Sequence, residues 1–137
     1  GALIPVVGVS NGSLARLTGN PVLAVAILFA VGLAASCGVL LVTGVHGVAA
    51  LRQAPPWLFV GGLIVGFYVL SVTVLAPRFG VGNTILFAVA AQVVTSAVID
   101  QFGLLGAVQK PVNVIRAAGI VVLVAGLVMT QLAAKKV

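Results

Sequence analysis

Few side chains in this 137-residue chain could take part in acid–base, nucleophilic or metal chemistry. The chain has one carboxylate, Asp100, one histidine, His46, and one cysteine, Cys37. Catalysis by paired carboxylates is therefore excluded within one copy, and a zinc site, which takes about four ligands, cannot be assembled. No glycine-rich phosphate loop is present. The sequence predicts neither an enzyme nor a bound metal or other cofactor.

Uncharged polar side chains inside long apolar runs are more informative. One such row recurs at the i+3/i+4 spacing of a helix and consists of Thr84, Ala88, Ala91, Gln92, Thr95 and Ser96. The row is either a substrate-lining stripe or a set of contacts between helices, with Gln92 bonded to a neighbour. As a lining, uncharged amides at the membrane midplane would suit a polar neutral or weakly cationic solute.

Three further polar residues are candidates for the substrate-lining set. Asn11 lies beside Gly8 and Gly12 in the first apolar run, and an unpaired amide in lipid costs a few kcal/mol. Tyr68 and Ser71 share a face of another run. The Tyr68 ring would either stack on a ligand cation or pack in the core with its hydroxyl bonded.

The elements that must position these residues follow from the composition. Of all residues, 62% are hydrophobic and 6% are charged, against about 25% charged in soluble domains. This excludes an ordinary soluble enzyme and a disordered chain, and it predicts an all-α integral membrane protein. Residues 1–137 are expected to form a single transmembrane domain of five helices, at about 1–15, 21–44, 57–76, 82–101 and 112–133.

The first of these segments is short for a span. About 15 residues at 1.5 Å each cover only about 22 Å, so we expect the start of this helix to lie before residue 1. Breaks in the pattern separate the other spans: Pro21 after Asn20, the pair Pro55-Pro56 before an interfacial Trp57, and Pro77 before Gly80.

The basic residues indicate the orientation of the chain in the membrane. With five spans, one side holds Arg16, Arg78, Lys135 and Lys136, and the other holds Arg52, Lys110 and Arg116. Because the Lys/Arg bias sets orientation, four against three predicts insertion both ways up. Two copies would then pair antiparallel into a ten-helix inverted-repeat bundle. The net charge of +6 is scattered rather than gathered in a patch, so no nucleic-acid partner is expected.

The chain resembles the drug/metabolite transporter superfamily, and within it the small five-helix YdcZ-type family. The matching stretches include Asn11 to Arg16, Gly61 to Gly66, Pro77 to Gly80, Gln92 with Ser96, Ile99 to Gly106, and Arg116 with Gly119. Related small multidrug resistance proteins work as antiparallel dimers and carry a buried Glu in helix one. Here helix one offers Asn11 and no acid, so their Glu-based exchange mechanism does not transfer.

Two structural predictions concern the last helix. Gly119, Gly126 and Ala133 recur every seven residues, which allows another helix to approach closely; by resemblance to the small multidrug proteins this seam would be the dimer contact. Asp100 and Arg116 are expected near one membrane face. They would form a structural ion pair, or Asp100 would couple protons to transport.

The resemblance and the polar stripe together predict a multi-pass transporter of the bacterial inner membrane. It would move a small organic metabolite or cation by alternating access, surrounded by membrane lipid. Its partner would be a second copy of itself or a similar five-helix protein. The alternative is a non-transporting membrane subunit, or a half-transporter that needs a different partner chain.

Overall fold

The computed structural model describes residues 1–134, and within them every regular element is helical. The chain divides into two compact units, residues 1–81 and residues 82–137. The predicted basic end at Lys135 and Lys136 lies outside the described residues.

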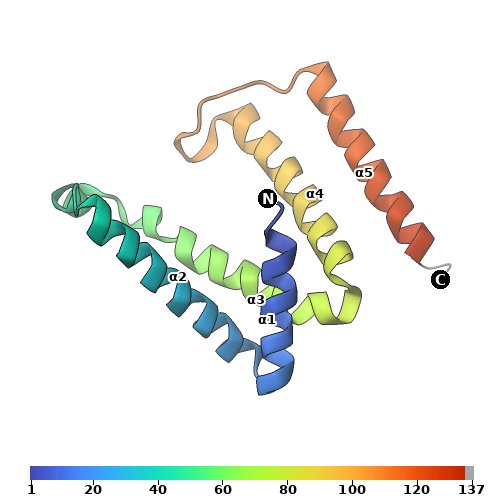
Figure 1. Cartoon of the computed structure of the whole chain (residues 1–137). Helices are drawn as coiled ribbons and strands as arrows, with labels where there is room; N and C mark the ends of the chain where they lie inside the picture. The colour runs from blue at the N-terminus through green and yellow to red at the C-terminus, as the bar shows by residue number, and fades with distance from the viewer. Residues whose placement is uncertain (135–137) are drawn as a thin grey trace. The chain divides into compact units, whose positions relative to one another are not determined.

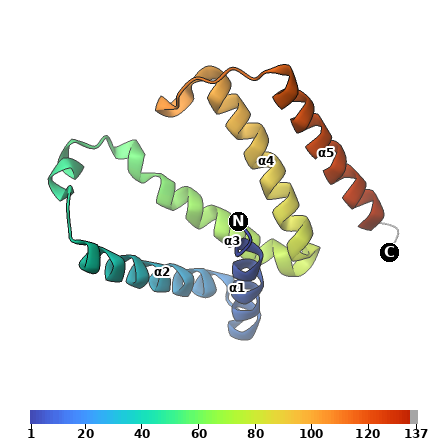
Figure 2. The same cartoon turned by 45° about the horizontal axis from the view of Figure 1, so that its top comes forward.

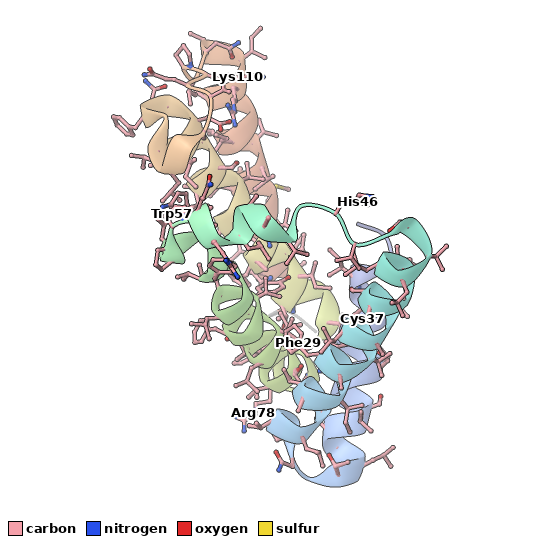
Figure 3. The ribbon with its side chains drawn as sticks, turned by 90° about the vertical axis from the view of Figure 1, so that its left-hand side faces the viewer. Phe29, Cys37, His46, Trp57, Arg78 and Lys110 are labelled. Carbon is pink, nitrogen blue, oxygen red and sulfur yellow. The ribbon has the colours of Figure 1, made fainter. Side chains whose placement is uncertain are left out.

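The first unit consists of α1 (Ile4–Thr18), α2 (Pro21–Thr43) and α3 (Gly61–Phe79). Helix α1 packs against both α2 and α3, and it crosses them at the end where it joins α2 (Figures 1 and 2). A loop with two 3₁₀ turns, Val48–Gln53 and Pro56–Phe59, connects α2 to α3. Arg78 lies at one end of this unit, and His46 and Trp57 lie at the other (Figure 3).

The turn from α1 to α2 follows from local chemistry. Gly19 ends α1 in the left-handed conformation, with φ of 65°, which glycine adopts without steric cost. The Asn20 side chain then accepts hydrogen bonds from the backbone N–H groups of Val22 and Leu23, at 3.0 and 3.1 Å. Pro21 opens α2, where a missing N–H costs nothing. The two helices are therefore joined by a fixed turn.

The interface of α1 is built from small residues. Its buried positions, Gly8, Asn11, Gly12 and Ala15, lie on one face of the helix. A Cβ at Gly12 would lie 3.4 Å from the ring of Pro77, and one at Gly8 would lie 3.5 Å from Val81. Close approach of this kind is how helices associate in lipid, where no hydrophobic force drives them together.

Pro77 does not end α3 as the sequence predicts. The helix continues through it to Phe79, because a proline in the last turn removes one backbone hydrogen bond without ending the helix. At the other end, the residues from Pro56 form a 3₁₀ turn, and α3 begins at Gly61 rather than at 57.

The second unit is a helical hairpin of α4 (Val81–Phe102) and α5 (Val114–Ala134), joined by a loop with a 3₁₀ turn at Leu104–Gly106. The two helices run side by side in opposite directions (Figures 1 and 2). Asn83 and Gln131 bond the hairpin at its open end, with Gln131 Nε2 donating to Asn83 Oδ1 at 3.1 Å. Asp100 and Arg116 join it at the loop end.

Within residues 1–134, four helical segments are long and apolar enough to cross a bilayer: Pro21–Thr43, Pro56–Phe79, Val81–Phe102 and Val114–Ala133. None of residues 114–133 is buried. Large apolar side chains such as Leu41, Leu63 and Ile115 are more than three-quarters exposed. A surface of this kind suits hydrocarbon rather than water, so the chain is an integral membrane protein.

Candidate functional site

Asn11, the polar residue predicted in the first helix, lies buried between α1 and α3. Its amide Nδ2 donates to Thr73 Oγ1 at 2.7 Å, and the Thr73 hydroxyl donates to the carbonyl oxygen of Val69 at 2.8 Å. These two bonds tie α1 to the backbone of α3 through polar groups alone. The arrangement satisfies an amide that lipid could not.

A small hollow beside this bond brings two of the candidate residues together. Asn11, Thr73 and Tyr68 all line it, with Ile4, Val7, Gly8, Val69 and Val72 completing the wall. Its volume is about 30 Å³, the share of one water molecule in the liquid. Ser71 is not among the lining residues, and its hydroxyl donates to the Phe67 carbonyl oxygen of its own helix at 2.8 Å.

A second, larger hollow lies on the same α1–α3 interface. It measures about 230 Å³ and contains one charged side chain, that of Arg16. The other lining residues are small or apolar: Gly8, Val9, Gly12, Ala76, Pro77, Gly80 and Val81. The glycines and Ala76 leave the space that larger side chains would fill.

The polar stripe of α4 lies mostly on the surface. Thr84 is buried, whereas Gln92, Thr95 and Ser96 are exposed. The Ser96 hydroxyl donates to the Val93 carbonyl oxygen at 2.9 Å. Among the hydrogen bonds of residues 1–134, none involves the side chain of Gln92 or Thr95.

Contacts within the hairpin show where this stripe points. Helix α4 meets α5 through Asn83 at one end. At the other end, Ala97 and Gln101 face the same apolar hollow as Ile120 of α5. At 100° per residue, Gln92 lies well over a quarter turn away from Ala97 around the helix. The polar partners of Gln92 are therefore not supplied by α5.

The predicted ion pair closes the loop end of the hairpin. Arg116 Nη2 lies 2.8 Å from Asp100 Oδ2, and the two side chains are 36% and 31% exposed. The backbone N–H of Lys110 donates to the Asp100 carbonyl oxygen at 2.8 Å, and the Gln101 side chain accepts from the backbone N–H of Val112 at 2.6 Å. The carboxylate therefore lies in the last turn of α4, beside a loop that several bonds already hold.

The seam predicted on α5 is open. Gly119, Gly126 and Ala133 are exposed, and a Cβ at either glycine would meet no other atom within 4 Å. The face of α5 with lower exposure carries Arg116, Ile120, Leu123, Leu127 and Gln131 instead. The seam is thus free to receive a helix from outside the hairpin, and its role as a dimer contact remains a prediction.

Three polar residues with a clear structural place were not among the predicted site residues. Thr73 receives the Asn11 bond, and Asn83 and Gln131 bond to each other. All three interrupt apolar runs, so their residue type was a usable signal. The sequence could not predict their partners, because the bonded residues are 62 and 48 positions apart.

Apolar spans, paired polar groups and the scattered basic residues define a multi-pass membrane protein rather than a soluble domain. A family model described as "Putative inner membrane exporter, YdcZ" matches residues 1–129, and the chain belongs to that family. It is therefore a multi-pass protein of the inner membrane, from a family of membrane transporters. No individual curated protein and no solved structure matches the chain significantly.

Proposed function

We propose that the chain exports a small organic metabolite or cation by alternating access. Five spans would cross the membrane in each copy, and two copies would pair antiparallel to give ten helices with inverted symmetry. The α4 stripe of Gln92, Thr95 and Ser96 would line the path of the solute. Tyr68 and Asn11 would contribute the α1–α3 hollow from their own unit.

The unpaired amide of Gln92 is the observation that carries this proposal. It lies near the middle of α4, and no described residue of the α4–α5 hairpin bonds to it. An amide left in hydrocarbon without a partner costs a few kcal/mol. The stripe therefore needs polar contacts from outside the α4–α5 hairpin. A water-filled path, with solute passing through it, would supply them.

Two features support the antiparallel pair. With five spans, the basic residues would divide four against three between the sides, which gives almost no orientation bias. The Gly119 and Gly126 seam has no atom over it, so a helix of a second copy could approach closely.

One observation favours the alternative, a membrane subunit that does not itself transport. Asn11 is bonded to Thr73 inside the fold, and the adjoining hollow holds no more than about one water. In the first unit, then, polar groups serve packing. The two functions differ in what they require of Gln92: water access in a transporter, and a bond to another helix in a subunit.

Thiol labelling in the membrane tests this difference. Cys37 is the sole cysteine, so Cys37→Ser gives a background into which Gln92→Cys and the matched control Phe87→Cys can be placed. Phe87 is exposed on another side of α4. Because thiolate forms in water, we expect a charged, membrane-impermeant thiol reagent to label Gln92→Cys at least about tenfold faster than Phe87→Cys. Equal, slow labelling of both variants would favour the structural subunit.

A further inference from the structure

The second hollow of the α1–α3 interface, which contains Arg16, shares no lining residue with the polar stripe of α4. We call it the Arg16 hollow. Arg16 lies in the last turn of α1 and brings the one charged group to a space of about 230 Å³ otherwise walled by small and apolar residues. Figure 3 shows Arg78 at the same end of this unit, but Arg78 is not part of the wall.

Within residues 1–134, no side chain supplies a counter-charge for Arg16. Its single carboxylate, Asp100, is already paired with Arg116 at 2.8 Å. Among the bonds of residues 1–134, Arg16 makes one side-chain hydrogen bond, from Nη2 to the Ser13 hydroxyl at 3.3 Å. A guanidinium has five N–H donors in a planar fork, so most of its donors are left unused by the described residues.

The space and the donors together define what would fit. A planar fork of N–H groups binds carboxylate or phosphate oxygens, often two at once. Arg16 is exposed, so an anion in solution could reach it. The volume is below the range of about 300–1,000 Å³ typical of sites for drug-sized ligands, and so suits a short organic anion.

We infer that the Arg16 hollow between α1 and α3 binds the anionic group of a small organic acid or organic phosphate. As a step in transport this rests on the proposed function, because it makes the exported metabolite one that carries a carboxylate or phosphate. In an antiparallel pair, the two copies would present the same hollow at opposite membrane faces. The solute would then meet equivalent anion sites on entry and on release.

Binding to the purified protein in neutral detergent tests the site without reference to transport. The probes are acetate, succinate, citrate and inorganic phosphate, with choline and guanidinium as cationic controls, all at one ionic strength and followed by calorimetry. We expect at least one anion to bind saturably. Arg16→Gln should weaken that binding at least tenfold, Arg16→Lys should weaken it less, and Arg78→Gln should leave it unchanged.

Three results would overturn the inference. The first is that no anion binds saturably to the wild-type protein. The second is that Arg16→Gln and Arg78→Gln weaken binding equally, which would indicate general charge attraction. The third concerns the protein in nanodiscs. If anions bind in neutral lipid but lose all binding when anionic phosphatidylglycerol is added at low fraction, lipid headgroups occupy Arg16 instead.

Transport assays with the same protein in proteoliposomes distinguish failure of this inference from failure of the proposed function. An anion that binds through Arg16 but is never transported leaves the site standing and contradicts export of that class of solute. Saturable transport of a solute whose uptake is unaffected by Arg16→Gln, with no anion binding in detergent, leaves export standing and overturns the site. Retained elution volume in size-exclusion chromatography checks that each variant is folded.

Discussion

The Nδ2 atom of Asn11 lies 2.7 Å from Oγ1 of Thr73, and this bond joins two helices whose residues are 62 positions apart. Because the pair is buried, Asn11 has a structural role, whether or not it also takes part in transport. The sequence analysis predicted Asn11 to line the substrate path, and its position beside Tyr68 is compatible with that role. Because of its bond to Thr73, replacing Asn11 should also lower the stability of the fold.

We expect Asn11→Ala to lower the free energy of unfolding by about 0.6 kcal/mol, and at most about 1.7 kcal/mol, which are the average and maximum for interhelical hydrogen bonds in a membrane protein, with a further loss from the space left behind. Unfolding by SDS in mixed micelles, followed by circular dichroism, measures this. A double-mutant cycle with Thr73→Val isolates the bond; additive effects of the two substitutions would contradict the pairing.

The Asp100–Arg116 pair should contribute little to stability. Both side chains are about one-third exposed, and pairs of that kind are worth about 0–1 kcal/mol. The loop also has its own bonds through Gln101 and Lys110. We therefore expect Asp100→Asn and Arg116→Gln each to destabilise the protein modestly, with a coupling of about 1 kcal/mol or less.

Transport against a pH gradient distinguishes this structural role from proton coupling. If Asp100 is structural, the Asp100→Asn variant keeps gradient-driven accumulation. If uptake without a gradient stays normal while accumulation disappears, Asp100 is the coupling residue.

The basic residues predict insertion in both orientations. If the chain crosses the membrane five times, four of them fall on one side and three on the other, and near-equal numbers do not fix a topology. Paired C-terminal fusions, one active in the cytoplasm and one in the periplasm, should both give signal. Adding two lysines to the loop around Arg52 should shift the ratio strongly. Signal from one fusion only would point instead to a heteromeric partner.

The α5 seam predicts a selective effect of side-chain size on dimerisation. Gly126→Val fills the open space of the seam, whereas Ala125→Val adds similar bulk on a different side of the helix. Chemical cross-linking in the membrane should show the dimer reduced severalfold in Gly126→Val and retained in Ala125→Val. Equal dimer in both variants would remove Gly126 from the interface.

The sequence was informative about the spans because hydrocarbon imposes a length and an apolar composition on each helix. It placed α2 at 21–44 and α5 at 112–133, close to Pro21–Thr43 and Val114–Ala134. It was less accurate where local geometry competes with pattern. Pro77 sits in the last turn of α3 and does not end it, and the 3₁₀ turn from Pro56 delays the start of that helix to Gly61.

The sequence does not predict which polar residues bond to each other. Helical spacing shows which residues share a face, but not which face meets which neighbour. Asn11 with Thr73 and Asn83 with Gln131 depend on how each helix is rotated in its unit. Asp100 and Arg116 were easier to pair because the chain has one acid, and they flank a single loop.

Solute transport in proteoliposomes tests the central claim, that this chain is an exporter whose path runs along the α4 stripe. Gln92→Leu removes an amide without a partner among the described residues of the α4–α5 hairpin, and Gln131→Leu removes one bonded to Asn83. The account predicts saturable uptake of at least one small organic solute by the wild-type protein. Gln92→Leu should lower that uptake at least about tenfold, corresponding to about 1.4 kcal/mol, with stability retained, while Gln131→Leu should lower stability with transport per folded protein retained. Wild-type uptake no greater than that of empty liposomes for every solute screened, or normal uptake by Gln92→Leu, would contradict the account.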